Sequence, residues 1–352
     1  MHLIRYPIWL GQGYFQSTQA RFKRQAKHFE PHALDVSLVG KVAVVTDIGA
    51  NSGLGKATTL SLLTKGVMVH MVCCNWEHAS KAWEEILEEA RQEVAQSEIT
   101  DHLKNNLIVD QMSLDNLPSI CAFVEKFANQ LSSHCNILVN NTGGLLQMAS
   151  VTPEGIQHSF ATNILGTYYL TELLVPLLAR TGSARVVMVS SGGMFLTPLD
   201  LDNLESMKKH AYSGNVAYSH KKRQQVELTQ VWARTYSNAQ GIHFLSMHPG
   251  WADMVTIQIA LPSFYNQFHN VFCTPAEGVD TIIWAAMAKA AQKVPNGSFL
   301  EDRQVTRQNL PFCWTQTQPG DPERLYTQCR HYATKVMGNV TFELVNLTGP
   351  SV

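Results

Sequence analysis

Short apolar runs rich in β-branched residues recur from residue 41 onward, and longer helical patterns separate them. Six runs predict strands, at 41–46, 67–73, 106–110, 137–140, 185–190 and 242–248. The segments 56–65 and 77–96 predict helices. Strands that are apolar along their whole length are typical of a parallel sheet with helices on both faces. The pattern therefore predicts an α/β fold with a single doubly wound parallel sheet, which binds ligands at the carboxyl ends of its strands.

Three segments differ in character. Residues 41–310 contain neither an internal repeat nor a linker and are expected to form one domain. Residues 1–40 form an N-terminal basic amphipathic extension with five basic and two acidic residues. Residues 311–352 are expected to form a C-terminal helix and a flexible tail, in which the glycosylation sequons at Asn339 and Asn346 are interpreted as chance matches.

The N-terminal extension carries Phe15, Phe22 and Phe29 at seven-residue intervals, which predicts that they share one face of a helix. Three interpretations stay open. The segment is a helix laid against the main domain, an amphipathic segment that touches a membrane surface, or a mitochondrial transit segment, since no acidic residue precedes Glu30.

Composition narrows the class of protein. The chain is 45% hydrophobic and 16% charged, which excludes a disordered protein, and its net charge of −1 lacks the basic excess of a nucleic-acid-binding protein. No apolar run approaches the ~18 residues of a membrane span. The seven cysteines form no CxxC pair, and His158, His220 and His248 are not spaced as metal ligands, so we expect no metal site. Reduced thiols favour the cytoplasm, with mitochondrial or membrane-peripheral locations as alternatives.

A glycine-rich turn directly follows the first predicted strand and opens the next helix. It contains Gly49, Asn51, Ser52, Gly53, Leu54 and Gly55. Glycines let the backbone approach a pyrophosphate while amides at the helix N-terminus point at it. A tight turn without a ligand is the alternative for this motif taken alone.

Further motifs follow in a fixed order. They are Asn140-Asn141-Thr142-Gly143, Asn163 in a helix, Ser190-Ser191 after the fifth strand, Tyr218-x-x-x-Lys222, and Pro249-Gly250 after the sixth strand. With the glycine turn they closely resemble the Rossmann-type short-chain dehydrogenase/reductase family, over about residues 40–310. The resemblance implies an NAD(P)-dependent oxidoreductase that interconverts a carbonyl and an alcohol.

The resemblance assigns a role to each catalytic candidate. Tyr218 would exchange a proton with the substrate oxygen, and Ser191 would hydrogen-bond and orient that oxygen. Lys222 would hold the nicotinamide ribose and lower the pKa of the tyrosine, and Asn163 would anchor a water through which protons reach solvent. Ser190 competes with Ser191 for its role, and we favour Ser191 because the second serine of such pairs matches the family position.

The Tyr218–Lys222 pair is four residues apart on a predicted helix, so both side chains share a face, whereas Lys221 lies about 100° away. Bringing a tyrosine pKa from about 10 to near 7 takes about 4 kcal/mol. An exposed ion pair supplies only about 0.3–0.5 kcal/mol. The pair is therefore expected to work only when partly buried beside another positive charge, such as an oxidised nicotinamide ring.

The same resemblance gives the cofactor-binding residues. They are Gly49, Asn51, Ser52, Gly53, Leu54, Gly55, Asp110, Asn140, Tyr218, Lys222, Pro249 and Gly250. Asp110 corresponds to an aspartate that contacts the adenine, with a plain loop aspartate as the alternative. NADP or NAD is the expected cofactor, and the resemblance favours NADP.

Three residues depart from the family pattern around the cofactor. Asp47 lies close to the phosphate site, where a carboxylate about 5 Å from a phosphate charge costs about 3 kcal/mol at an effective dielectric of 20. Cys74 stands where relatives that choose NADP carry an arginine, and Lys56 is a partial substitute. Met254 replaces a threonine, with Thr256 two residues further on. These departures motivate a rival hypothesis, a non-catalytic Rossmann-type binding protein with a degraded cofactor pocket.

The segment after the sixth strand, where the family builds its substrate lid, is rich in aromatic residues. It contains Trp251, Leu261, Phe264, Tyr265, Phe268 and Phe272, and the insert 194–216 also borders the site. An aromatic lid suits a small hydrophobic carbonyl or alcohol substrate, lipid-like or steroid-like. The alternative is that these residues pack the core. A homo-oligomer, and a membrane surface contacted through residues 1–40, complete the expected partners.

Overall fold

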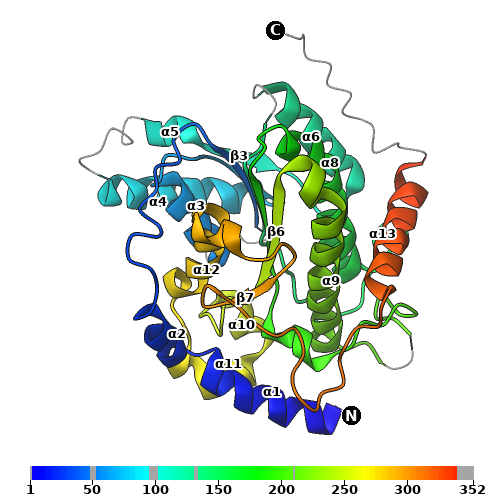
Figure 1. The fold of residues 1–352 in the computed structure, drawn as a ribbon. Coiled ribbons are helices and arrows are strands. Elements are labelled where there is room, and N and C mark those ends of the chain that lie inside the picture. Colours follow the sequence, from blue (N-terminus) through cyan, green and yellow to red (C-terminus); the bar gives the residue numbers. More distant parts are fainter. Residues whose placement is uncertain (1, 48–52, 95–101, 131–133, 209–210, 339–352) are drawn as a thin grey trace.

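The computed structural model describes residues 2–47, 53–94, 102–130, 134–208 and 211–338, and these form a layered α/β structure (Figure 1). Its eight-stranded sheet has the order β3-β2-β1-β4-β5-β6-β7-β8. The strands are β1 Val42–Asp47, β2 Met68–Cys73, β3 Leu107–Gln111, β4 Ile137–Asn140, β5 Ala184–Val189, β6 Ile242–Met247, β7 Phe299–Glu301 and β8 Gln304–Val305. All pairs are parallel except β7 with β8. The predicted single, doubly wound parallel sheet is confirmed.

Helices cover both faces of this sheet. The main ones are α3 Leu54–Leu63, α4 Trp76–Glu93, α6 Leu117–Gln130, α8 Thr167–Ala179, α9 Gly214–Gln240 and α12 Pro275–Met287. Shorter ones are α5 Leu103–Asn106, α7 His158–Phe160, α10 Val255–Ala260, α11 Pro262–Phe268, the π-helical η2 Ala161–Gly166, and the 3-10 turns η3 Gly192–Leu196, η4 His269–Val271 and η5 Ala290–Lys293.

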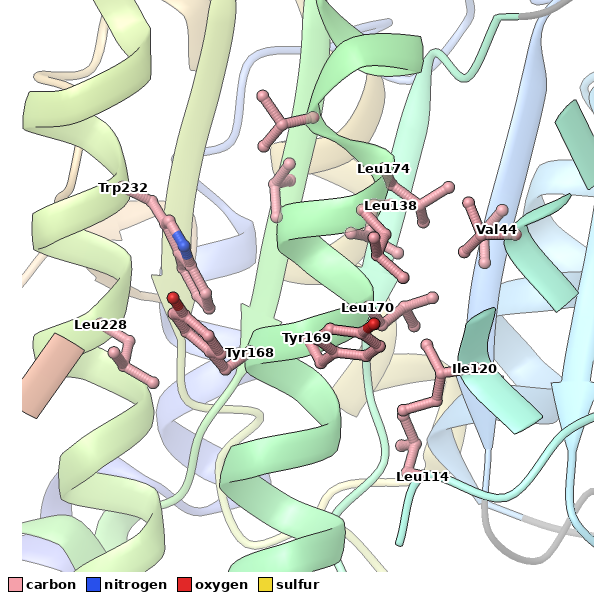
Figure 2. Close-up of a cluster of buried hydrophobic side chains, with 14 of the residues drawn as sticks. Val44, Leu114, Ile120, Leu138, Tyr168, Tyr169, Leu170, Leu174, Leu228 and Trp232 are labelled. Carbon is pink, nitrogen blue, oxygen red and sulfur yellow. The ribbon is translucent and has the colours of Figure 1, made fainter. Parts of the chain in front are cut away.

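The strand side chains alternate between two hydrophobic cores. Val44 and Leu138 face α6, α8 and α9 and belong to a core that extends through Leu170 to Trp232 (Figure 2). Ala43 and Val45 face the opposite core, which α3, α4 and α12 complete. Because β1 is buried on both faces, its first four residues are all apolar.

The N-terminal extension folds as two helices, α1 His2–Gln16 and α2 Gln19–Ala26. The predicted shared face of Phe15, Phe22 and Phe29 is wrong, because the first helix ends before the second phenylalanine. Phe15 is 71% exposed, whereas the rings of Phe22 and Phe29 pack 5.9 Å apart. The break between α1 and α2 is stabilised by Ser17, whose carbonyl accepts a hydrogen bond from Trp251 N at 2.6 Å.

The helix α13, Asp321–Met337, packs along α9 at the other end of the chain. Its tyrosine Tyr326 joins Trp232 and Tyr236 in donating hydrogen bonds to the buried carboxylate of Glu172. The sequons at Asn339 and Asn346 lie outside the described residues. Within the described part of the chain, no helix is both long and apolar enough to cross a membrane.

Candidate active site

A cavity of about 510 Å³ opens at the carboxyl ends of the central strands, within the usual size range of small-molecule sites. Its floor is made by residues that end or follow β1, β4, β5 and β6: Asp47, Asn141, Gly143, Ser190, Ser191, His248, Pro249 and Gly250. One wall comes from Tyr218 and Lys222 on α9. The roof comes from α1, α10 and α11, which gather at one end of the molecule in Figure 1.

The predicted serine, tyrosine and lysine meet in this cavity. Tyr218 and Ser191 both line it, with the Ser191 side chain close enough to lower the pKa of the phenol, and the Lys222 Nζ atom lies 5.4 Å from the centre of the Tyr218 ring. Ser190 turns inward and donates its hydroxyl to the Lys222 carbonyl at 2.9 Å. Ser191 is therefore the serine of the pair whose hydroxyl reaches the tyrosine, and Ser190 fastens α9 to the end of β5.

Burial shifts both titratable groups of this pair. It raises the pKa of Tyr218 to about 12, against the smaller lowering effect of the hydrogen bond with Ser191. It lowers the pKa of Lys222 to about 7. A nearby lysine alone thus leaves the phenol protonated at neutral pH. A further positive charge in the cavity would favour the phenolate and lower the tyrosine pKa.

Asn163 lies next to this group, fully buried in η2. Its side chain accepts from Gly144 N at 2.8 Å and donates to Gly144 O at 2.9 Å. Its own carbonyl accepts from Gln225 Nε2 at 3.0 Å, and a water anchored by Asn163 stays a prediction. Gln225 was missed by the sequence reasoning; its position one helical turn after Lys222 is the signal that could have found it.

The glycine turn is described only from Gly53 onward, and Gly49, Asn51 and Ser52 lie outside the described residues. Gly53 adopts a φ of +91°, which favours glycine, and Gly53 and Leu54 line the cavity where α3 begins. A Cβ at Gly55 would collide with the carboxylate of Asp47. A Cβ at Gly143 would lie 2.5 Å from Lys222 Nζ.

Two of the three departures from the family pattern, Asp47 and Met254, line the cavity, whereas Cys74 does not. Asp47 lines it, with its carboxylate against the first turn of α3. Met254 lies across the glycine turn, its Cγ 4.0 Å from where a Gly53 Cβ would be, and Thr256 also lines the cavity. Lys56 pairs with Glu85 at 2.7 Å and Glu89 at 2.9 Å on α4, and a contact from it to a phosphate stays a prediction.

Two predicted cofactor residues point away from the cavity. Asp110 is buried and joins His70 Nδ1 at 2.6 Å and Lys126 Nζ at 2.8 Å. Asn140 donates to Thr171 Oγ1 at 3.0 Å, beneath the cavity. The neighbouring Asn141 lines the cavity in its place. An adenine contact by Asp110 stays a prediction.

The cavity fits a pyridine nucleotide in shape and in its donors. Glycines at 53, 143 and 250 leave room for close backbone approach, and the N-terminal amides of α3 suit phosphate. Among the described lining residues, Lys222 is the one lysine or arginine and Asp47 the one carboxylate. The carboxylate opposes phosphate binding, so the backbone amides must supply most of the attraction.

The roof includes residues that the sequence analysis did not assign to the site. Tyr6 and Trp9 of α1 line the cavity, and Trp9 Nε1 donates to Gly192 O at 2.8 Å. Trp251 and Phe264 meet Trp9 with ring centres 6.0 and 5.9 Å away. Phe268 and Phe272 stack behind Phe264. The aromatic segment thus both lines the cavity and packs the roof.

His248, to which the sequence analysis gave no role in the site, lies in the cavity floor. Its Nδ1 accepts from Gly192 N at 3.1 Å, so any ring proton is on Nε2. Burial lowers the pKa of His248 to about 4. The imidazole is therefore neutral at physiological pH.

Comparisons with known proteins agree with this geometry. Residues 41–199 match the family model of the short chain dehydrogenases. The chain is 35% identical over 325 residues to dehydrogenase/reductase SDR family member 12 of Homo sapiens, covering 92% of this chain and 96% of that protein. It is 31% identical over 271 residues to retinol dehydrogenase 12 of Homo sapiens, covering 76% and 79%. Its fold is similar to that of an Escherichia coli CFT073 protein solved with NADPH, with a TM-score of 0.57, 18% identity, and coverage of 77% of this chain and 99% of that one.

Proposed function

Because the chain belongs to the short-chain dehydrogenase/reductase family, and is thus an NAD(P)-dependent oxidoreductase acting on CH–OH groups, we propose that Tyr218 is its general acid and base. The observation that carries this proposal is the meeting of Ser191, Tyr218 and Lys222 in one cavity, with Lys222 Nζ 5.4 Å from the centre of the Tyr218 ring. A bound nicotinamide supplies or accepts the hydride.

Three residues of the chain transfer the proton, orient the substrate and bind the cofactor. In the direction of reduction, Tyr218 gives its proton to the substrate oxygen as negative charge develops there. Ser191 donates a hydrogen bond to the same oxygen and orients it. Lys222 has one N–H left after its bonds to Val189 O and Gln225 Oε1, and this N–H is available to a ribose hydroxyl.

We propose a small hydrophobic, lipid-like carbonyl or alcohol as the substrate. The apolar roof made by Trp9, Trp251 and Phe264 supports this class. So does the similarity to a retinol dehydrogenase, whose name states that it acts on a hydrophobic alcohol.

We propose NADP(H) as the preferred cofactor. The chain just after β2 offers Cys74 and Asn75, neither of which is a carboxylate that would accept a ribose 2′-hydroxyl or repel a 2′-phosphate. The side chain of Asn75 is already used as the N-cap of α4, accepting from His78 N. Parallel titrations with NADPH and NADH test the preference, and equal or tighter binding of NADH would reject it.

The function is tested by following NADPH oxidation with a panel of aliphatic, terpenoid and steroid aldehydes and ketones. Wild type is expected to turn over the apolar members, and Tyr218→Phe to lose at least about 100-fold in kcat, in keeping with the loss of a general acid. Tyr332→Phe is the matched control, because that hydroxyl donates to Glu205 on the far side of α9. Equal losses in both variants would reject the role of Tyr218.

A further inference from the structure

The ammonium group of Lys222 is buried without a carboxylate partner among the described residues. Lys222 is 2% exposed, and its Nζ donates to two neutral oxygens, Val189 O at 2.8 Å and Gln225 Oε1 at 3.0 Å. A buried cation is costly unless hydrogen bonds replace its hydration. These two acceptors therefore decide where the ammonium points.

Gln225 links Lys222 to the opposite side of the site. The two residues are three apart on α9 and share a face. The carboxamide of Gln225 is fully buried. It accepts from Lys222 through Oε1 and donates to Asn163 O through Nε2 at 3.0 Å. Since Asn163 is itself clamped to Gly144 by two hydrogen bonds, the chain of contacts ends on the loop that follows β4.

A carboxamide at this position has a particular chemical consequence. It stays neutral across the physiological range and neither gives nor takes a proton, unlike a water or a carboxylate. It therefore blocks proton exchange on the side of the Lys222 ammonium that faces away from the cavity. The front of the ammonium faces Gly143, where a Cβ would lie 2.5 Å from Nζ.

We propose that Gln225 is a positioning residue of the active site: its carboxamide aims the Lys222 ammonium at the cavity and leaves the cavity as the only route by which that ammonium exchanges protons. The catalytic role of Gln225 rests on the proposed function. The effect of its carboxamide on the Lys222 ammonium can be tested without turnover.

The other charged groups near Lys222 either point away from it or are the same in wild type and in the Gln225 variants. Tyr218, Asp47 and His248 share the cavity with Lys222. The two cations beside it on α9 point elsewhere: Lys221 donates to Leu204 O and Ser206, and Arg223 donates to Asn309 and Thr315. A change in the titration of Lys222 in a Gln225 variant is thus attributable to the carboxamide.

The test is a pH titration of the full chain labelled with ¹³Cε-lysine, in which Lys222 is assigned by the signal that disappears in Lys222→Met. Gln225→Glu places a carboxylate next to the ammonium and is expected to raise the Lys222 midpoint by about one unit or more. The matched control is Gln224→Glu on the same helix, whose amide instead donates to Leu204 O. It is expected to leave the midpoint within about 0.3 units.

Equal midpoints in wild type and Gln225→Glu would overturn the proposal. Should Gln225→Glu fail to fold, Gln225→Met takes its place against Gln224→Met. Removing the acceptor is expected to lower the midpoint, because the charged form loses a hydrogen bond; an unmoved midpoint overturns the proposal equally. The titration needs neither cofactor nor substrate, so its failure is distinct from a failure of wild type to transfer hydride.

Discussion

The carboxylate of Asp47 offers a quantitative test of how this chain holds its cofactor. Asp47 lines the cavity at the end of β1, and its carboxylate lies against Gly55 in the first turn of α3, the end of that helix that attracts phosphate. Asp47→Asn keeps the shape of the side chain and removes its charge. The variant is therefore expected to bind NADPH more tightly.

The size of the effect follows from Coulomb's law. One phosphate charge about 5 Å from the carboxylate costs about 3 kcal/mol at an effective dielectric of 20. Water in an open cavity screens part of this, so we expect a gain of about 1.4–3 kcal/mol, or roughly 10- to 150-fold in Kd. The gain should shrink as salt is added, because counter-ions screen exposed charges within about 10 Å at 0.1 M.

Fluorescence titration of NADPH at low and high salt measures both quantities. Asp115→Asn is a suitable control, because Asp115 pairs with His158 at 3.3 Å away from the cavity lining. Equal dissociation constants for wild type and Asp47→Asn would refute the reasoning. They would mean that the phosphates lie elsewhere than at the start of α3.

Three further predictions concern stability and substrate choice. Burial lowers the pKa of Lys222 to about 7 from 10.5, so the free-energy cost of burying its charge is fully present below pH 7 and is gone above pH 10.5. Lys222→Met should therefore raise the free energy of unfolding more at pH 6 than at pH 9. Equal increases at the two pH values in urea melts would contradict this. Trp9→Ala should raise KM about 10-fold for a bulky apolar ketone and less than about twofold for a small one; equal changes would show that Trp9 does not form the roof, and Trp76→Ala, at an exposed site, is the control. Burial pushes the pKa of Asp110 upward, but hydrogen bonds from His70 and Lys126 leave it below 3.8. Asp110→Asn should lower the free energy of unfolding by about 3 kcal/mol at pH 7, and this loss should become smaller as the pH falls below 3.8. A loss of stability that does not depend on pH would exclude the ion pair as its cause.

The sheet and the proximity of Tyr218 and Lys222 could be predicted because their signals are local. Each buried strand needs a run of apolar residues, and six of the eight strands have one. The missed strands, β7 and β8, have only three and two residues, too few to show a period. Tyr218 and Lys222 are four apart on one helix, so spacing alone places them on one face.

Contacts between distant segments were beyond prediction. Trp9 meets Gly192 across 183 positions and His70 meets Asp110 across 40, and neither pairing leaves a pattern in the sequence. The regular spacing of Phe15, Phe22 and Phe29 was misleading, because the spacing alone does not show that the first helix ends at Gln16. Asp110 shows the same limit: its position resembles the family pattern, but its carboxylate also bonds to a buried histidine and to a lysine.

The most direct test of the central claim follows a labelled hydride. NADPH carrying deuterium at C4 of the nicotinamide is incubated with the enzyme and an apolar aldehyde, and the alcohol is analysed by mass spectrometry. Wild type is expected to give the deuterated alcohol, and Tyr218→Phe to give almost none even when it is saturated with NADPH. Deuterated alcohol at the same rate from Tyr218→Phe, or none from wild type saturated with NADPH across the aldehyde panel, would contradict the account.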